Sequence, residues 1–128
     1  MSGFGTFNGR APFAFRPGVL LHAIGGDQVL LCRVTYEPGF GVGRHAHADT
    51  EQVMLILDGD LTMTIGDETR TVGPGDVVVV NRGVEHELRS EGGVTFVEAL
   101  APVPLDHVPD PERDLVLGDL AGALHVDR

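Results

Sequence analysis

The feature that most constrains the fold is a series of short β-type segments separated by turn residues along most of the chain. Groups such as Pro38-Gly39, Asp58-Gly59 and Gly73-Pro74-Gly75 interrupt the apolar runs at the spacing of about 8–12 residues that is typical of an all-β sandwich or barrel. The sequence therefore predicts an all-β fold. Strands are expected at residues 19–23, 28–37, 52–57, 61–65, 70–72, 76–80, 86–90 and 94–100.

The chain of 128 residues reads as one domain. We expect an N-terminal arm at residues 1–18, a barrel at 19–102 and a C-terminal tail at 103–128, with a helix at 111–117 as one interpretation of the tail. Four of the six phenylalanines lie in the arm, so the arm should pack on the barrel or on a second subunit. The uninterrupted valines of residues 77–80 predict a strand that is covered on both faces.

Charge and cysteine content exclude several classes of function. The net charge is −10, and every one of the nine basic residues is Arg, which argues against nucleic acid or an anionic membrane as a partner. The single cysteine, Cys32, permits no internal disulfide and no thiolate zinc cluster, and we expect an inert buried thiol. No apolar run approaches a membrane span and no signal sequence is apparent, so a cytoplasmic location is expected.

Three histidines are candidate metal ligands. On a strand, His45 and His47 would point to the same face about 7 Å apart, which lets two imidazoles bind one ion. His86 begins a later apolar segment and would add a third. An isolated His-x-His pair is more often solvated, but here a Gly-rich turn precedes it and an apolar strand follows. The other histidines, His22, His107 and His125, have no such spacing.

The two histidine segments resemble the two sequence motifs of the cupin superfamily. The resemblance extends over residues 25–100, and it is strongest to small single-domain bacterial cupins. It implies a double-stranded β-helix (a jelly-roll barrel of two antiparallel sheets), a bound divalent metal ion and a homodimer. The matching residues are Gly39, His45, His47 and Gly59 in the first motif, and Gly75, Gly83 and His86 in the second.

The fourth ligand of the family motif is Glu, and this chain departs from it. Counting back from Gly59 places Gln52 at that position, whereas Glu51 fits the shorter spacing from His47. Because residues 48–50 read as a turn or bulge that resets the strand phase, we expect Gln52 to be the ligand and keep Glu51 as the alternative. A neutral amide leaves the ion's full charge uncompensated. Zn or Ni is therefore favoured, with Fe or Mn as alternatives.

This arrangement resembles one branch of the superfamily, the KdgF-type enzymes, which open the ring of 4,5-unsaturated uronates. Glu98 matches the acidic residue of that branch, but Leu100 replaces its aromatic residue and no Arg follows before Arg113. A substrate carboxylate favours a bidentate arginine partner. An apolar cavity fits an aromatic or polyketide-like substrate better, so the metal-dependent cupin polyketide cyclases are a competing resemblance.

Strand parity indicates which side chains face the cavity. Glu98 shares its parity with Phe96 and Leu100, and Gln52 shares its parity with Met54 and Ile56, so these six are expected to face inward. Met54 and Ile56 are expected to line the cavity, and core packing explains them equally well. Glu98 would transfer a proton to or from the substrate. The alternative is that it is a surface Glu at a strand end with no catalytic role. The first expected function is metal-dependent non-redox isomerisation, ring opening or cyclisation of a small molecule. A metal-dependent dioxygenase and a non-catalytic binding or sensor module are the alternatives.

Overall fold

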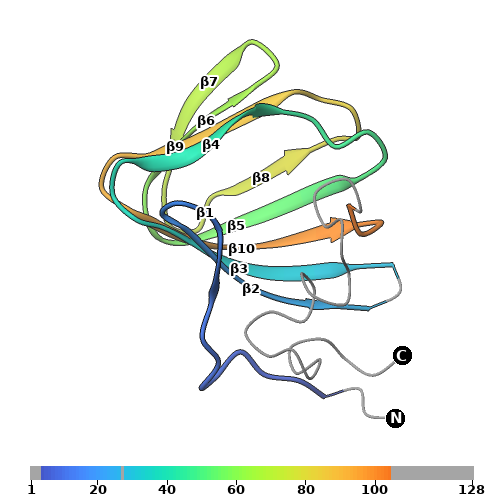
Figure 1. Cartoon of the computed structure of the whole chain (residues 1–128). Helices are drawn as coiled ribbons and strands as arrows, with labels where there is room; N and C mark the ends of the chain where they lie inside the picture. The colour runs from blue at the N-terminus through green and yellow to red at the C-terminus, as the bar shows by residue number, and fades with distance from the viewer. Residues whose placement is uncertain (1–3, 27, 105–128) are drawn as a thin grey trace.

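Two antiparallel sheets face each other in the protein (Figure 1). A computed structural model describes residues 4–26 and 28–104, and every element in these residues is a strand. The all-β prediction with two antiparallel sheets is therefore confirmed. In order across the six-stranded sheet, the strands are β1 (Phe13–Arg16), β2 (Val19–Gly25), β3 (Leu30–Tyr36), β10 (Val94–Ala101), β5 (Glu51–Gly59) and β8 (Val77–Val80). In order across the four-stranded sheet, they are β4 (Phe40–His45), β9 (His86–Ser90), β6 (Leu61–Ile65) and β7 (Glu68–Val72).

The core lies between the two sheets and follows the period of two that strands impose. Along β5, burial alternates from residue to residue: Met54 and Ile56 are almost fully buried, whereas Val53 and Leu55 are 38% and 39% exposed. Each fully buried large apolar side chain contributes roughly 1.5–3 kcal/mol relative to an exposed one. The largest fully buried side chains are Val19, Val34, Met54, Ile56, Leu61, Val80, His86 and Phe96.

Two strands were missed by the sequence prediction. The predicted arm ends in β1, which pairs antiparallel with β2 through a turn at Pro17-Gly18, where Gly18 has a φ of 73°. The six-stranded sheet therefore begins at Phe13 rather than at Val19. The segment expected as a Gly-rich turn is β4, which pairs with β9. Glycines weaken the strand signal in the sequence, but here Gly41 permits a close approach of two backbones.

The N-terminal arm packs on the barrel, which was one of its two expected positions. Phe15 lies against the hydrophobic core, and the ring of Phe7 lies 5.6 Å from that of His22. His22 is buried on β2 and is hydrogen-bonded through Nε2 to the carbonyl of Arg10 at 2.7 Å. Phe4 is 93% exposed. The homodimer stays a prediction.

The expectation that residues 77–80 are covered on both faces was wrong. Val78 and Val80 are buried, but Val77 and Val79 are 61% and 49% exposed. The reason is that β8 is an edge strand of the six-stranded sheet, and its outward face continues the exposed apolar face of β5. A run of valines predicts a strand, but it does not establish what covers each face.

A close approach between β4 and β9 yields a test of the fold. A Cβ at Gly41 would lie 2.1 Å from the Leu88 carbonyl oxygen and 2.8 Å from the Arg89 Cα, both of them backbone atoms. Gly41→Ala should therefore push the two strands apart and lower the free energy of unfolding by roughly 1–3 kcal/mol. Urea unfolding measures this loss.

The matched control is Gly43→Ala on the same strand, because a Cβ there would meet nothing within 4 Å. Its unfolding midpoint should stay close to that of the wild type. Equal stability of the two variants would contradict the close approach of β4 and β9.

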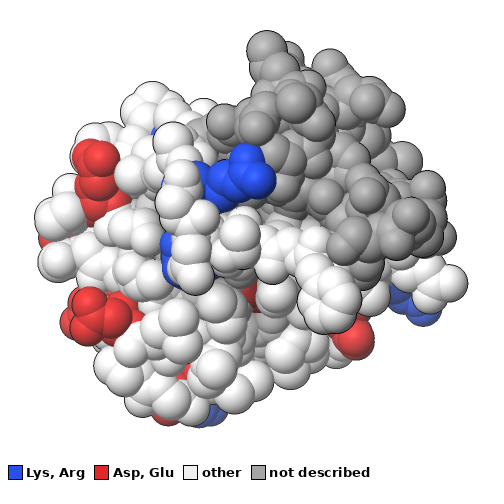
Figure 2. All heavy atoms as spheres, turned by 90° about the horizontal axis from the view of Figure 1, so that it is seen from below, with Lys and Arg blue, Asp and Glu red and all other residues white. Residues whose placement is uncertain are grey.

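The surface carries the charge imbalance seen in the composition. Figure 2 shows one face on which the arginine side chains are scattered among uncharged ones and do not merge into an extended basic patch. The exclusion of nucleic acid as a partner stays a prediction. No helix within residues 4–26 and 28–104 has the length and apolarity to cross a membrane. The helix expected at 111–117, and the tail beyond residue 104, lie outside the described residues.

Candidate metal centre

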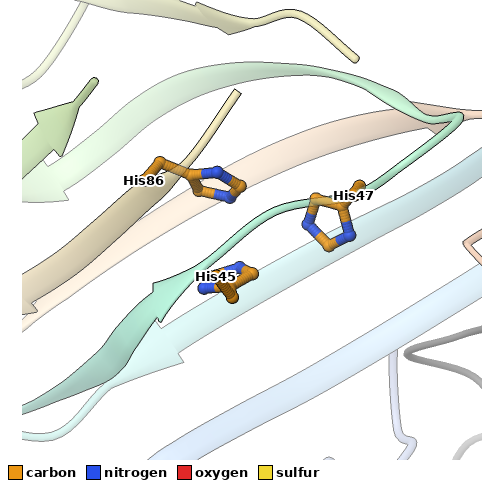
Figure 3. A group of neighbouring side chains, drawn as sticks. All are labelled: His45, His47 and His86. Atoms are coloured by element: carbon orange, nitrogen blue, oxygen red, sulfur yellow. The ribbon is translucent and has the colours of Figure 1, made fainter. Parts of the chain in front are cut away.

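Three histidines from two strands and a loop are gathered inside the barrel (Figure 3). Their ring centroids are 4.1 Å apart for His45 and His86, 5.1 Å for His45 and His47, and 5.2 Å for His47 and His86. Each ring offers a nitrogen atom, and these atoms all lie within 4.8 Å of one another. His86 is fully buried and His47 is 7% exposed. The three side chains are thus placed to hold one metal ion.

The local chain path explains how the three rings meet. His45 ends β4 directly opposite His86 in the register with β9. The sequence had suggested that His47 lies on the same strand as His45. In the structure His47 lies in the segment 46–50, which follows that strand. The His47 carbonyl accepts a 2.8 Å hydrogen bond from the Gly83 amide, and Thr50 donates one to the Pro102 carbonyl at 2.7 Å. These bonds tie the loop to the turn before β9 and to the end of β10.

Backbone carbonyls orient two of the rings. Nδ1 of His45 lies 2.7 Å from the Gly43 carbonyl oxygen, and Nδ1 of His86 lies 3.0 Å from the Val84 carbonyl oxygen. Because a carbonyl only accepts hydrogen bonds, each Nδ1 carries the proton. In the neutral imidazole, Nε2 then carries the lone pair. This support is typical of metal-ligating histidines.

Gln52, rather than Glu51, faces the interior. Gln52 is 4% exposed and Glu51 is exposed, because the bend at residues 48–49 resets the phase before β5 begins. The amide nitrogen of Gln52 donates a hydrogen bond to the carboxylate of Glu98 on β10. The other end of the amide, Oε1, is buried and has no hydrogen-bond partner among the described residues. A buried amide oxygen in this state fits the role of a metal ligand.

An apolar pocket opens beside the histidines, with its polar groups contributed by a few side chains. Glu98 is the only acidic residue in its lining and remains partly exposed to it. Phe96 and Leu100 line the pocket with Glu98, as parity predicted. The lining consists of Phe15, Leu21, Leu30, Cys32, Val34, Tyr36, Val42, His45, His47, Gln52, Leu88, Phe96, Glu98, Leu100 and Pro104.

Two expected lining residues are not in the pocket. Met54 and Ile56 point inward on β5, but they are 0% and 1% exposed and belong to the closed core. The strands that contribute most lining residues to the pocket are β3 and β10, and Gln52 is the only β5 residue that reaches it. Parity indicates which face of a strand is interior, but it does not show where the interior is left open.

Sequence reasoning also missed lining residues from β3, including Cys32 and Tyr36. The signal was present, because Leu30, Cys32, Val34 and Tyr36 alternate at a period of two along one strand. Burial raises the pKa of the Cys32 thiol and of the Tyr36 hydroxyl, and the nearby Glu98 carboxylate raises both further. Both side chains are therefore protonated, and Cys32 is a free, buried thiol as expected.

The carboxyl group of Glu98 has a shifted pKa. Burial raises the pKa of Glu98 from its ordinary value to about 7, and the hydrogen bond from Gln52 opposes that rise. The cause is desolvation of the charged form in the apolar pocket.

Comparisons with known proteins agree with the fold. A family model described as "Cupin domain" matches residues 32–100, and the chain belongs to this family. No curated protein sequence matches the chain closely enough to count as a relative.

Several solved structures have the same fold. The structure of KdgF from Halomonas sp. matches with a TM-score of 0.76 and 18% identity, over 83% of this chain and 98% of that one. An RmlC-like cupin from Shewanella frigidimarina matches with a TM-score of 0.76 and 16% identity, over 83% and 96%. A predicted oxalate decarboxylase from Thermotoga maritima matches with a TM-score of 0.67 and 18% identity, over 78% and 99%. At these identities, the likeness establishes the fold.

Proposed function

We propose that the protein is a metal-dependent enzyme that catalyses a non-redox isomerisation, ring opening or cyclisation of an oxygenated small molecule. The observation that carries the proposal is the composition of one pocket. Two histidines, the amide of Gln52 and the carboxylate of Glu98 line the same apolar space, and the ring of His86 lies 4.1 Å from that of His45.

The donor set is suited to a divalent cation. His45, His47, His86 and Gln52 would hold the ion, and all four are neutral ligands that do not reduce its charge. A bound ion of this kind supplies Lewis acidity toward a substrate oxygen. The neutral set favours Zn or Ni, as expected from the sequence, with Fe or Mn as alternatives.

Glu98 supplies the proton acceptor in this proposal. It is the one acidic side chain of the lining, and apolar residues such as Phe96 and Leu100 flank it on β10. A carboxylate held in such a pocket lies within reach of a substrate that is bound beside the histidines. A positioned acid–base group contributes about 10²–10⁴-fold to a rate.

The apolar lining favours a small molecule with one hydrophobic face and a few oxygen atoms. A polyketide-like compound fits this description. An unsaturated sugar acid is supported by the resemblance to KdgF-type enzymes and by the matching fold of the Halomonas KdgF structure. The lining includes no arginine, so a substrate carboxylate would need another partner.

A turnover assay tests the proposal. The protein is stripped with a chelator, reloaded separately with Zn²⁺, Ni²⁺, Mn²⁺ or anaerobic Fe²⁺, and incubated with unsaturated uronates and with polyketide-like substrates. The expected result is a product of unchanged mass that forms without oxygen and only in a metal-loaded sample. Oxygen consumption would instead select a dioxygenase, and retention of a ligand without a product would select a binding or sensor module.

A further inference from the structure

We propose that Glu98 is a positioning residue for Gln52. By accepting the hydrogen bond of the Gln52 amide nitrogen, it fixes which end of that amide is presented to a divalent cation among the three histidines. The inference rests on the metal site of the proposed function, and it adds a second role for Glu98 that is independent of proton transfer.

The geometry comes from two neighbouring strands. Gln52 on β5 pairs directly with Leu100 on β10, and Glu98 lies two residues along the same strand. Gln52 and Glu98 are therefore diagonal neighbours on the inward face, a position from which long side chains reach one another. Their contact joins the amide nitrogen to a carboxylate oxygen.

The two ends of an amide have nearly the same shape but opposite chemistry. The nitrogen end donates hydrogen bonds and has no lone pair for a cation, whereas the oxygen end can coordinate one. Turning the amide by half a turn would exchange the two ends at little steric cost. Without a further contact, nothing in the shape of the pocket would decide which end faces the cation.

Glu98 makes that decision because an ionised carboxylate only accepts hydrogen bonds. It attracts the nitrogen end of the Gln52 amide, so Oε1 is the end that points away from Glu98. This Oε1 is the buried atom without a hydrogen-bond partner among the described residues. A single contact thus accounts for both the orientation of the amide and the unsatisfied oxygen.

Two substitutions of Glu98, by glutamine and by leucine, separate its positioning of Gln52 from its role in proton transfer. Glu98→Gln keeps an oxygen that can accept the hydrogen bond, although it adds a nitrogen that can donate one. Glu98→Leu has a similar size and can do neither. Loss of an outer partner of a metal ligand typically lowers metal affinity about 10–100-fold. We expect a loss of this size for Glu98→Leu and a Co²⁺ affinity within about threefold of the wild type for Glu98→Gln.

The experiment titrates apo protein with Co²⁺, whose visible absorption bands report the number and geometry of ligands. Gln52→Leu and the double variant Gln52→Leu/Glu98→Leu complete a cycle with the wild type and Glu98→Leu. If Glu98 acts through Gln52, Glu98→Leu should weaken binding in the wild type and have no further effect once Gln52 is replaced. An equal loss in both backgrounds would mean a structural role or direct ligation, and would overturn the proposal.

Side-chain amide NMR tests the same point in the wild type, which removes any dependence on the folding of a variant. The chain contains only two glutamines, Gln28 and Gln52, and Gln28 is exposed. The Gln52 amide protons should exchange more slowly than those of Gln28 and should stay hydrogen-bonded when Zn²⁺ is added. Amide protons of Gln52 that behave like those of Gln28 would contradict the proposal.

The outcomes distinguish this inference from the proposed function. A wild type that binds neither Co²⁺ nor Zn²⁺ would overturn both. A wild type that binds Co²⁺ with the same affinity and spectrum as Glu98→Leu would overturn only the positioning role and would leave the metal site intact.

Discussion

A His86→Ala variant is expected to contain no metal ion, whereas the wild type, purified without a tag, should contain near-stoichiometric metal. His86 is fully buried, and its ring lies 4.1 Å from that of His45 and 5.2 Å from that of His47. Removing it takes away one of three imidazole ligands and leaves no other described histidine, cysteine or acidic side chain in the cluster. Elemental analysis measures the result and also identifies the metal.

Metal binding should also appear as stability, because a ligand that binds only the folded state stabilises it. For the wild type, free Zn²⁺ at a hundred times its Kd should raise the free energy of unfolding by about 2.7 kcal/mol. Unfolding of His86→Ala should not respond to Zn²⁺. This comparison separates loss of the ligand from the cavity that the substitution leaves in the core, which lowers stability with or without metal.

The control for this experiment is His22→Gln. His22 lies on β2 outside the cluster and is hydrogen-bonded to the Arg10 carbonyl through Nε2, an interaction that the amide nitrogen of glutamine can replace. This variant should keep its metal. Equal metal content in His86→Ala and the wild type, or none in the wild type even after reconstitution, would contradict the metal site.

The parts of the fold that the sequence predicted correctly are those with a strong local pattern. Alternation at residues 61–65 identified β6, and the apolar run before Asp58-Gly59 identified β5. The missed strand β4 contains Gly41 and Gly43, whose lack of a side chain removes the pattern. Its strand conformation is imposed by pairing with β9, a contact distant in the sequence.

In the candidate site, too, the features with a local sequence pattern were predicted and those that depend on distant contacts were not. Histidine spacing and the count back from Gly59 selected His45, His47 and Gln52 as candidate ligands without a structure, and the structure places all three side chains at one pocket. The inward direction of Gln52 depended on a bend at residues 48–49, and the turn residues of the sequence indicated it. By contrast, the hydrogen bond from Gln52 to Glu98 joins two strands 46 residues apart, and no local pattern encodes such a contact.

The Glu98→Gln variant should lose turnover while it keeps its metal ion. Glutamine has nearly the same shape as glutamate and preserves an acceptor for the Gln52 amide, but it cannot take up a proton at neutral pH. We expect kcat to fall by about 10²–10⁴-fold, with the metal content unchanged in elemental analysis. Metal-dependent turnover of the substrate found in the assay above provides the measurement.

The matched control is Glu51→Gln, which makes the same change in charge at an exposed carboxylate on β5, one residue from Gln52. Because Glu51 faces away from the pocket, its variant should keep the activity of the wild type. Activity retained in Glu98→Gln would remove Glu98 from proton transfer and leave it as the partner that orients Gln52. Loss of both activity and metal in Glu98→Gln would instead mean that the ion requires a carboxylate at position 98, because the amide of the variant can donate a hydrogen bond to Gln52 Oε1 as well as accept one.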